Sequence, residues 1–369
     1  WAARTNWWYW LNVVGFVPSV MIPMVSVFKQ LFWPEMPFMV LIALCIAGTW
    51  LIALLTMIPL KSSKMLNNAG TAAKILFCIA LIAGGIKVAL DGGSCTDLSI
   101  QNMTPSFNLA LLALIPTFAY GLTGMDAIAT ASDEMKDPVR DMPRAMIVST
   151  VIAMLLYLLS IVAVEIILPQ GQIDGTTGLI DAVLKIYGSD GVVSVLVGIA
   201  LALLYFSNAF AWPLAASKTA QEAAEQGEFP KVFAISNKYG SPVGGAIVLA
   251  AASTVLIVLY AFIAGSNENL FWTILAFTGV IFLLPYILMD IAYIKLRRED
   301  ARTPRPIKIP DCIATVSFLL NVVMLIVSVI AFLLPPEGEG ASYMVILVGT
   351  LVGTQIIGEI IVARSSKNA

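Results

Sequence analysis

A hydrophobic stretch of the chain is interrupted by flexible and polar residues at 118–126, where the sequence is FAYGLTGMD. Lipid offers no hydrogen-bonding partners to backbone groups, so non-helical backbone at membrane depth is tolerated only where it lines a cavity or is buried in protein. Gly121 and Gly124 allow backbone angles that other residues resist. A helix broken in this way is the best sequence indicator of the binding site of a secondary transporter. The pattern therefore predicts one half of a substrate site here.

The residue types around the break indicate which ligand groups it would accept. Thr123 and Asp126 have capping-box spacing, which predicts that a second half-helix begins at Thr123. The free N–H groups and positive dipole at a helix start suit a carboxylate. The ring of Tyr120 suits an ammonium or guanidinium group. The alternative is a glycine kink that serves packing, with Asp126 as a capping residue. We favour a substrate site because an acid, an aromatic residue and two glycines coincide.

Two further groups of polar and aromatic residues have helical spacing. Asn208 and Trp212 are four residues apart and share a helix face. Tyr9 and Asn12 share another face with Phe16. Packing or an interfacial position is the alternative for Trp212, and a buried interhelical hydrogen bond is the alternative for Asn12.

Ionisable residues within the apolar stretches need a separate explanation. Lys74 lies in the first two turns of its span, and a membrane lysine costs roughly 3 kcal/mol on insertion scales, so it usually faces protein. Snorkelling to the membrane surface is the alternative at this depth. Asp290 and Glu165 lie near span ends, which favours an interfacial position. For Glu359, in the last span, we expect an oligomer contact or snorkelling.

The composition indicates the elements that must hold these residues. The chain is 59% hydrophobic and 12% charged, with a mean hydropathy of +0.90, whereas soluble domains carry about 25% charged residues. We therefore expect an all-α polytopic membrane protein. A helix needs about 20 apolar residues to cross the bilayer. Ten stretches qualify: 8–28, 37–59, 69–89, 109–131, 145–168, 191–215, 243–264, 270–294, 313–334 and 344–362. Residues 178–187 suggest a short surface helix.

The distribution of basic residues predicts the orientation in the membrane. With Trp1 in the cytoplasm, nearly all of the 21 lysines and arginines are cytoplasmic; Lys29, Lys87 and Lys185 lie outside, and Lys74 lies within a span. This is a strong positive-inside bias. We expect a multi-pass protein of the cell (inner or plasma) membrane with both termini of the chain cytoplasmic. The tryptophans at the start of the first span are typical of an interfacial aromatic belt: Trp1, Trp7, Trp8 and Trp10.

Several functional classes are disfavoured by what the sequence lacks. It has no histidine, which removes the usual neutral-pH proton switch and most metal sites. It has no nucleotide-binding loop, no cluster of metal ligands and no nucleophile elbow. We therefore expect no enzyme activity, no catalytic residues, no metal and no cofactor. The absence of a basic patch excludes nucleic acid as a partner.

Four motifs, in order along the chain, resemble one family. Residues 118–145 (FAYGLTGMDAIATASDEMKDPVRDMPRA) resemble the sixth transmembrane segment and following loop of the amino acid–polyamine–organocation (APC) superfamily. Residues 212–242 resemble the eighth segment and loop of its arginine/agmatine and putrescine antiporters. The YWLN at 9–12 resembles the start of the third segment, and the LPPEG at 334–338 resembles glutamate/GABA antiporters.

This resemblance implies an inverted-repeat, LeuT-like transporter fold with twelve spans. The chain matches segments three to twelve and so contains ten of them, and the resemblance implies that the first two lie outside it. Residues 1–369 would then form a single transmembrane transporter domain. Residues 1–90 would be the remainder of the first repeat, 109–295 the second repeat, and 312–362 two additional helices.

The resemblance implies secondary transport of amino acids, or exchange of an amino acid for an amine, by alternating access. Asp126 stands where the family usually has glutamate, which shortens the reach of the acid. Exchange follows if the empty carrier cannot reorient, and proton symport follows if Lys74 or Asp126 titrates. The substrate-binding candidates are Tyr120, Gly121, Thr123, Gly124, Asp126, Trp212, Asn208, Tyr9 and Asn12; the coupling candidates are Lys74 and Asp126.

The expected partners are an amino acid or amine substrate and the lipid bilayer. The resemblance also implies a homodimer through the last spans, and the residues themselves leave the oligomeric state open. The alternative function is a non-transporting membrane receptor or a truncated, inactive remnant.

Overall fold

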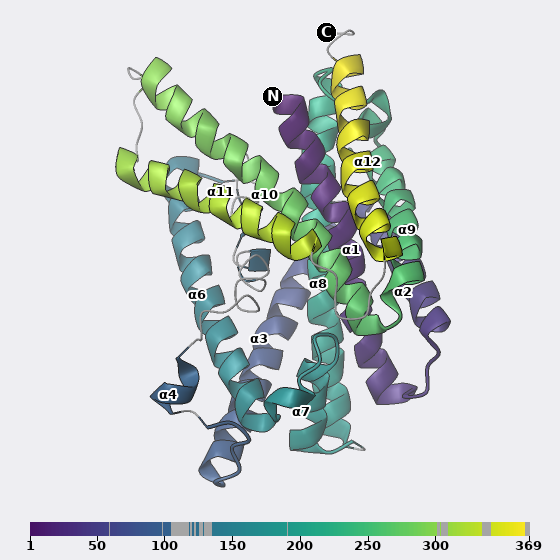
Figure 1. Ribbon diagram of the computed structural model, residues 1–369, viewed down its shortest axis with the longest axis vertical. Helices are drawn as coiled ribbons and strands as arrows, with labels where there is room; N and C mark the ends of the chain where they lie inside the picture. Colours follow the sequence, from purple (N-terminus) through teal and green to yellow (C-terminus); the bar gives the residue numbers. More distant parts are fainter. Residues whose placement is uncertain are drawn as a thin grey trace.

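The computed structural model describes most of the chain in helical form (Figure 1). The described residues are 1–58, 60–97, 99–104, 118, 120–121, 123–124, 128, 135–189, 191–300, 303, 309–333 and 341–365. Asp126 and most of the fourth expected span, 109–131, lie outside them.

Most of the described residues lie in long helices. Nine of these helices are long and apolar enough to cross a membrane. The long helices are α1 (Ala2–Phe32), α2 (Phe38–Thr56), α3 (Leu60–Leu90), α6 (Pro138–Ile167), α8 (Val192–Glu225), α9 (Val243–Ala264), α10 (Asn267–Glu299), α11 (Asp311–Leu333) and α12 (Ala341–Ser365). The short helices are α4 (Ile100–Met103), η2 (Gln170–Gln172), α7 (Gly178–Tyr187) and η3 (Lys231–Ala234).

These helices confirm the spans predicted outside 109–131. Each of the other nine predicted stretches coincides with one long helix, and α7 occupies the residues predicted as a short helix. Where a helix begins or ends, the cause is local. The Asp137 side chain accepts a hydrogen bond from the backbone N–H of Arg140, with Pro138 at the first helical position of α6. Gly265, with φ of +58°, ends α9 in a left-handed conformation.

Helix α1 is the central element of the structure. It runs through the middle of the bundle and packs most extensively on α8 and α10, with further contacts to α2 and α9 (Figure 1). Its inner residues, such as Val13, Val17 and Met21, are fully buried. A residue on α1 can therefore reach several helices that are distant in the sequence.

The tryptophans at the start of α1 correct one prediction. Trp7 and Trp10 are buried, with exposed fractions of 6% and 2%. Their rings pack on Phe229 and Phe233 beside η3, at centroid distances of 6.5 Å for Trp7–Phe229 and 4.9 Å for Trp10–Phe233. The prediction of an interfacial aromatic belt is wrong for these two, because a helix so central turns most of its faces toward protein.

Small residues allow the central helices to approach closely. A Cβ atom added at Gly15 of α1 would lie 2.2 Å from Oγ1 of Thr278 on α10. One added at Gly70 of α3 would lie 2.0 Å from Cβ of Ser207 on α8. Such close approach is typical of helix packing in membranes, and it brings α10 to α1 and α3 to α8 beside the candidate site residues.

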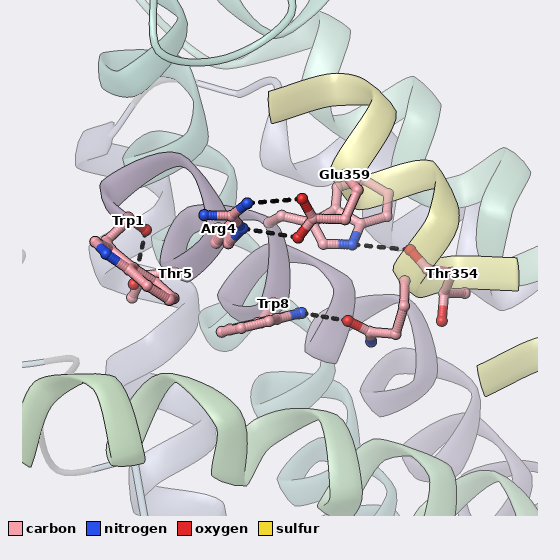
Figure 2. Close-up of polar contacts among 8 residues, drawn as sticks. Trp1, Arg4, Thr5, Trp8, Thr354 and Glu359 are labelled. Carbon is pink, nitrogen blue, oxygen red and sulfur yellow. Dashed lines mark hydrogen bonds and ion pairs between the residues drawn. The ribbon is translucent and has the colours of Figure 1, made fainter. Parts of the chain in front are cut away.

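Helix α12 is fastened to the start of α1 by a row of polar contacts, which we call the α1–α12 clamp (Figure 2). Arg4 donates two hydrogen bonds to the Glu359 carboxylate, at 2.7 and 2.8 Å. Nε1 of Trp7 donates to the backbone carbonyl of Thr354 at 3.1 Å. Nε1 of Trp8 donates to Oε1 of Gln355 at 2.7 Å. The partner of Glu359 is therefore Arg4 of the same chain, and its side chain is 56% exposed, so the expected oligomer contact or snorkelling stays a prediction.

Candidate functional site

The described part of the broken segment is a tight turn. The backbone N–H of Thr123 and its hydroxyl both donate to the carbonyl of Tyr120, at 3.3 and 2.8 Å. Gly124 follows with φ of +94°, a conformation that L side chains rarely adopt. The helix therefore breaks at Gly124. The Thr123 hydroxyl bonds back to the first half-helix, and its predicted partner Asp126 lies outside the described residues.

Asn12 of α1 joins three other parts of the chain. Its Nδ2 donates to the backbone carbonyl of Thr278 at 3.1 Å and to the hydroxyl of Tyr120 at 3.3 Å. Its Oδ1 accepts a hydrogen bond from Nε1 of Trp212 at 2.9 Å. The side chain is fully buried. Both amide hydrogens are thus used, and one residue links α1 with α8, α10 and the broken segment. We call this set of contacts the Asn12 junction.

Aromatic rings surround the Asn12 junction. Trp212 lies 5.6 Å from Tyr9 and 6.4 Å from Phe16, measured between ring centroids. Phe282 of α10 meets Tyr120 and Trp212 edge to face, at 5.3 and 5.5 Å. Aromatic pairs prefer such edge-to-face arrangements. The predicted candidates Tyr9, Tyr120 and Trp212 are therefore brought together by the fold.

Tyr286 is a site residue that the sequence analysis missed. Its hydroxyl accepts a hydrogen bond from the backbone N–H of Gly124 at 3.0 Å, and its ring lies 5.1 Å from Phe282. It therefore holds the turn where the helix breaks. The sequence contains a weak signal for it: Thr278, Phe282 and Tyr286 recur every four residues and so share one face of α10.

The two glycines of the break differ in their surroundings. A Cβ atom at Gly124 would lie 3.2 Å from the Trp212 ring, so the backbone approaches α8 closely there. Gly121 is exposed, and a Cβ added to it would meet nothing within 4 Å. Of the two, Gly124 is the one that the aromatic rings enclose.

Lys74 and Asn208 form a second polar contact beside the Asn12 junction. The Lys74 ammonium donates to Oδ1 of Asn208 at 3.0 Å, between α3 and α8. Gly70, one helical turn before Lys74, lets α3 approach α8 closely and so brings Lys74 within reach of Asn208. Lys74 therefore points at protein in this structure and does not snorkel. Asn208 faces α3, whereas Trp212, one turn further along α8, faces Asn12.

The remaining intramembrane acids lie away from the Asn12 junction. Asp290 of α10 accepts hydrogen bonds from Asn321 and Ser317 of α11, at 2.6 and 3.3 Å. Asp290 therefore lies between α10 and α11, and the membrane-interfacial position expected for it stays a prediction. Glu165 accepts a hydrogen bond from Thr96 at 3.3 Å. Within the described ranges, no group of three or more His, Cys, Asp or Glu residues could hold a metal ion.

This arrangement has the parts needed to hold a small zwitterion or amine. Aromatic faces stabilise ammonium and guanidinium groups, and Tyr120, Trp212 and Tyr9 provide such faces. At the break the Gly124 N–H is bonded to the Tyr286 hydroxyl and not to a carbonyl of its own helix, so a ligand could take the place of this side chain. The side chains come from α1, α8, α10 and the broken segment, so relative movement of these elements changes the site.

Comparison with known proteins gives consistent matches. The model of a family described as amino acid permease matches residues 1–354. A probable agmatine/putrescine antiporter, AguD of Lactococcus lactis, is 27% identical, over 99% of this chain and 79% of the relative. An uncharacterized transporter of Legionella pneumophila is 24% identical, over 90% of this chain and 73% of the relative. A glutamate/gamma-aminobutyrate antiporter of Lactococcus lactis is 23% identical, over 80% of this chain and 62% of the relative.

Proposed function

The chain belongs to the amino acid permease family, and we propose that it transports an amino acid, or exchanges an amino acid for an amine, by alternating access across the cell membrane. The observation that carries this proposal is the Asn12 junction. It joins Tyr120 of the broken segment to Asn12 of α1 and Trp212 of α8. These three residues are far apart in the sequence, and each belongs to a segment that alternating access would displace.

The roles of the site residues follow from their chemistry. A substrate ammonium group packs on the rings of Tyr120, Trp212 and Tyr9. A substrate carboxylate is bound by backbone N–H groups around Gly121, Thr123 and Gly124, and by those of the second half-helix that Asp126 would cap. The Thr123 and Gly124 N–H groups donate to the Tyr120 carbonyl and the Tyr286 hydroxyl in this structure, so a carboxylate must replace these acceptors. Asn12 selects the substrate side chain. To contact a substrate it must exchange one of its present partners, which couples binding to movement of the broken segment.

We propose that the substrates carry an amino group, either a basic amino acid with its amine or glutamate with GABA. The names of two relatives include agmatine, putrescine and gamma-aminobutyrate, all of which contain amino groups. The aromatic surroundings of the Asn12 junction support the same class, because several rings contact one another around a small polar centre.

Coupling to protons is assigned to Lys74, with Asp126 as the second candidate. Lys74 is an intramembrane cation that points at Asn208 of α8, one turn from Trp212. Loss of its proton would remove the charge that this contact carries, so protonation and substrate occupancy would be linked through α8. Where Lys74 does not titrate, the carrier would exchange one substrate for another.

We propose that the chain is organised as parts of two inverted repeats followed by two helices. Residues 1–90 are the remainder of the first repeat, 109–295 the second, and 312–362 two further helices. The start of α1 and the end of α12 lie at one end of the bundle (Figure 1), which agrees with the proposal that both termini are cytoplasmic. The exposed apolar face of α11, with Leu319, Val323 and Ile326, is the surface proposed for a homodimer.

Flux measurements on the purified full-length protein test the proposal. Proteoliposomes would be loaded in turn with basic amino acids, their amines, glutamate and GABA, and uptake of each labelled compound would be followed with and without a proton gradient. Trp212→Ala removes an aromatic wall of the site. Trp33→Ala is the matched control, because the Trp33 side chain is 45% exposed outside the site.

Saturable uptake of one substrate class that is lost in Trp212→Ala and kept in Trp33→Ala is the expected result. Saturable uptake that is equal in the two variants would mean that the site lies elsewhere. No uptake of any of these compounds by the wild type would contradict transport and favour a receptor or an inactive remnant.

A further inference from the structure

A second, apolar cavity lies on the opposite side of α1 from the Asn12 junction. It has a volume of about 730 Å³ and is bounded by α1, α9, α12 and the η3 turn. This volume falls within the roughly 300–1,000 Å³ of ordinary ligand pockets. Trp10 and Val14 of α1, Leu256 of α9 and Ile357 of α12 are among its lining residues. None of the residues proposed to bind substrate or couple protons lines it.

The walls of this cavity offer hydrocarbon and very little else. Thr350 and Thr354 of α12 line it, but their hydroxyls donate to the Ile346 and Leu351 carbonyls of the same helix, at 2.7 and 2.9 Å. Gly349 and Gly353 also line it, and a Cβ added at either would meet nothing within 4 Å. The cavity wall on α12 therefore lies apart from the neighbouring helices at these two glycines.

The cavity is elongated and faces the membrane. Its lining on α12 extends from Val345 to Ile361, which is about 24 Å of helix at 1.5 Å per residue. Val345, Val255 and Ile357 belong to the lining and are 69%, 58% and 50% exposed. In a bilayer with a hydrocarbon core about 30 Å thick, a space of this length and polarity is filled most favourably by an acyl chain.

The end of the cavity nearest the chain termini has polar and basic character. Trp10 lines the cavity, and its indole N–H is buried without an acceptor in the described part of the chain. Lys231 lies between Pro230 and Val232, which both line the cavity. Its side chain is exposed, and no ion pair among the described residues includes it. An acceptor and an anion would therefore both be stabilised at this end.

We propose that this cavity binds an anionic phospholipid. One acyl chain lies between α9 and α12 along Gly349 and Gly353, and the headgroup phosphate pairs with Lys231. The Trp10 N–H is fully buried in this structure, so the indole ring turns toward the cavity for an ester oxygen to accept its hydrogen bond. A phospholipid matches the apolar length, the buried donor and the basic end together. A second copy of the chain would not, because Gly349 and Gly353 face inward to the cavity. The α1–α12 clamp holds α12 in place while the lipid fills the space beside it.

Photolabelling in proteoliposomes tests this directly. The full-length protein would be reconstituted in phosphatidylcholine vesicles with a trace of phosphatidylglycerol that carries a diazirine in its acyl chain, and labelled peptides would be mapped by mass spectrometry. We expect label on α9 and α12 well above that on α6, whose outward face is equally apolar. Gly353→Leu fills the cavity with protein hydrocarbon and should reduce the α9 and α12 label several-fold. It should fold normally, since no atom lies near its Cβ position.

The matched control is Val352→Leu, which adds hydrocarbon to an exposed position on α12 outside the cavity and should leave the label unchanged. Equal labelling of α6 and of the cavity helices would mean ordinary contact with the surrounding bilayer and would overturn the proposal. Undiminished label in a Gly353→Leu protein with wild-type thermal stability would overturn it as well.

Two further variants test the polar end. In Lys231→Gln, unlabelled phosphatidylglycerol should compete with the labelled lipid about fivefold less effectively. This is the effect of one basic residue near an anionic lipid surface. Lys238→Gln, in the same loop, should leave the competition unchanged. Trp10→Phe keeps an aromatic ring but removes the N–H. Loss of this hydrogen bond should weaken the binding of phosphatidylglycerol about fivefold. Equal competition by phosphatidylcholine and phosphatidylglycerol in the wild type would overturn the assignment of the headgroup.

Discussion

Two parts of helix α1 are built on different principles. The turn around Asn12 carries the Asn12 junction, where a fully buried amide is hydrogen-bonded to α8, α10 and the broken segment. The first two turns carry the α1–α12 clamp, whose Arg4 and Glu359 side chains are 32% and 56% exposed. The Asn12 junction holds movable elements together through polar groups that have no access to water. The clamp attaches a peripheral helix through contacts near the surface.

The two sets of contacts differ in the free energy that is lost when a contact breaks. A buried polar group left without a partner costs about 1–3 kcal/mol, whereas an exposed ion pair contributes little because water replaces it. A substrate that takes over a hydrogen bond of the Asn12 junction therefore acts on a contact with a large energetic consequence. Changes at the α1–α12 clamp should leave transport almost intact.

The largest effect is expected for Asn12→Leu. This change leaves the Trp212 N–H and the Thr278 carbonyl without their present partner, at about 1–3 kcal/mol for each such group. We expect a lower thermal stability together with loss of saturable flux. Thr49→Val is the control, because the buried Thr49 hydroxyl bonds only a carbonyl of its own helix. Wild-type flux in Asn12→Leu would show that the Asn12 junction is structural only.

Alanine substitutions at Gly15 and Gly353 compare how tightly α1 and α12 pack on their neighbours. Gly15→Ala should destabilise the protein by about 1–3 kcal/mol, the cost of overpacking, because the new Cβ would lie 2.2 Å from Thr278 Oγ1. Gly353→Ala should instead stabilise it slightly, since alanine favours a helix over glycine by about 1 kcal/mol and nothing lies near its Cβ. Thermal unfolding in one detergent compares the two. The opposite order would contradict the packing described here.

Lys74→Gln tests whether Lys74 couples transport to protons. The glutamine amide can still hydrogen-bond to Asn208 but cannot be protonated at neutral pH. We therefore expect flux to continue and to lose its dependence on a proton gradient. Lys87→Gln is the control on the same helix, because Lys87 is exposed. Gradient-dependent flux that is unchanged in Lys74→Gln would remove Lys74 from the coupling mechanism.

The smallest effect is expected for Arg4→Gln and Glu359→Gln. Both side chains lie near the surface, so removing the ion pair should leave the thermal unfolding temperature within experimental error and the flux unchanged. The double variant should behave like either single one. A large loss of flux in these variants would mean that α12 takes part in transport, which would remove the distinction between the Asn12 junction and the α1–α12 clamp.

Much of the fold could be predicted because apolar length and helix period are local properties of the sequence. The broken segment identified Tyr120 and Gly124, and helical spacing identified Tyr9, Asn12 and Trp212. Phe282 and Tyr286 were missed because their four-residue spacing from Thr278 lies in α10, a helix so apolar along its length that this spacing is only a weak signal. Trp7 and Trp10 were misplaced because a tryptophan at the start of a span looks the same whether it faces lipid or η3. Which helices surround α1 is a tertiary property that the spacing of residues does not contain.

Ligand-induced thermal stabilisation of Tyr120→Ala, compared with the wild type and Trp33→Ala, is the most direct test of the central claim. Binding to the folded protein stabilises it by about 2.7 kcal/mol at a hundredfold excess of ligand over Kd. The account predicts that one class of amino acid or amine stabilises the wild type and Trp33→Ala, and that Tyr120→Ala loses the shift. The same shift in all three proteins would contradict a substrate site at the broken segment.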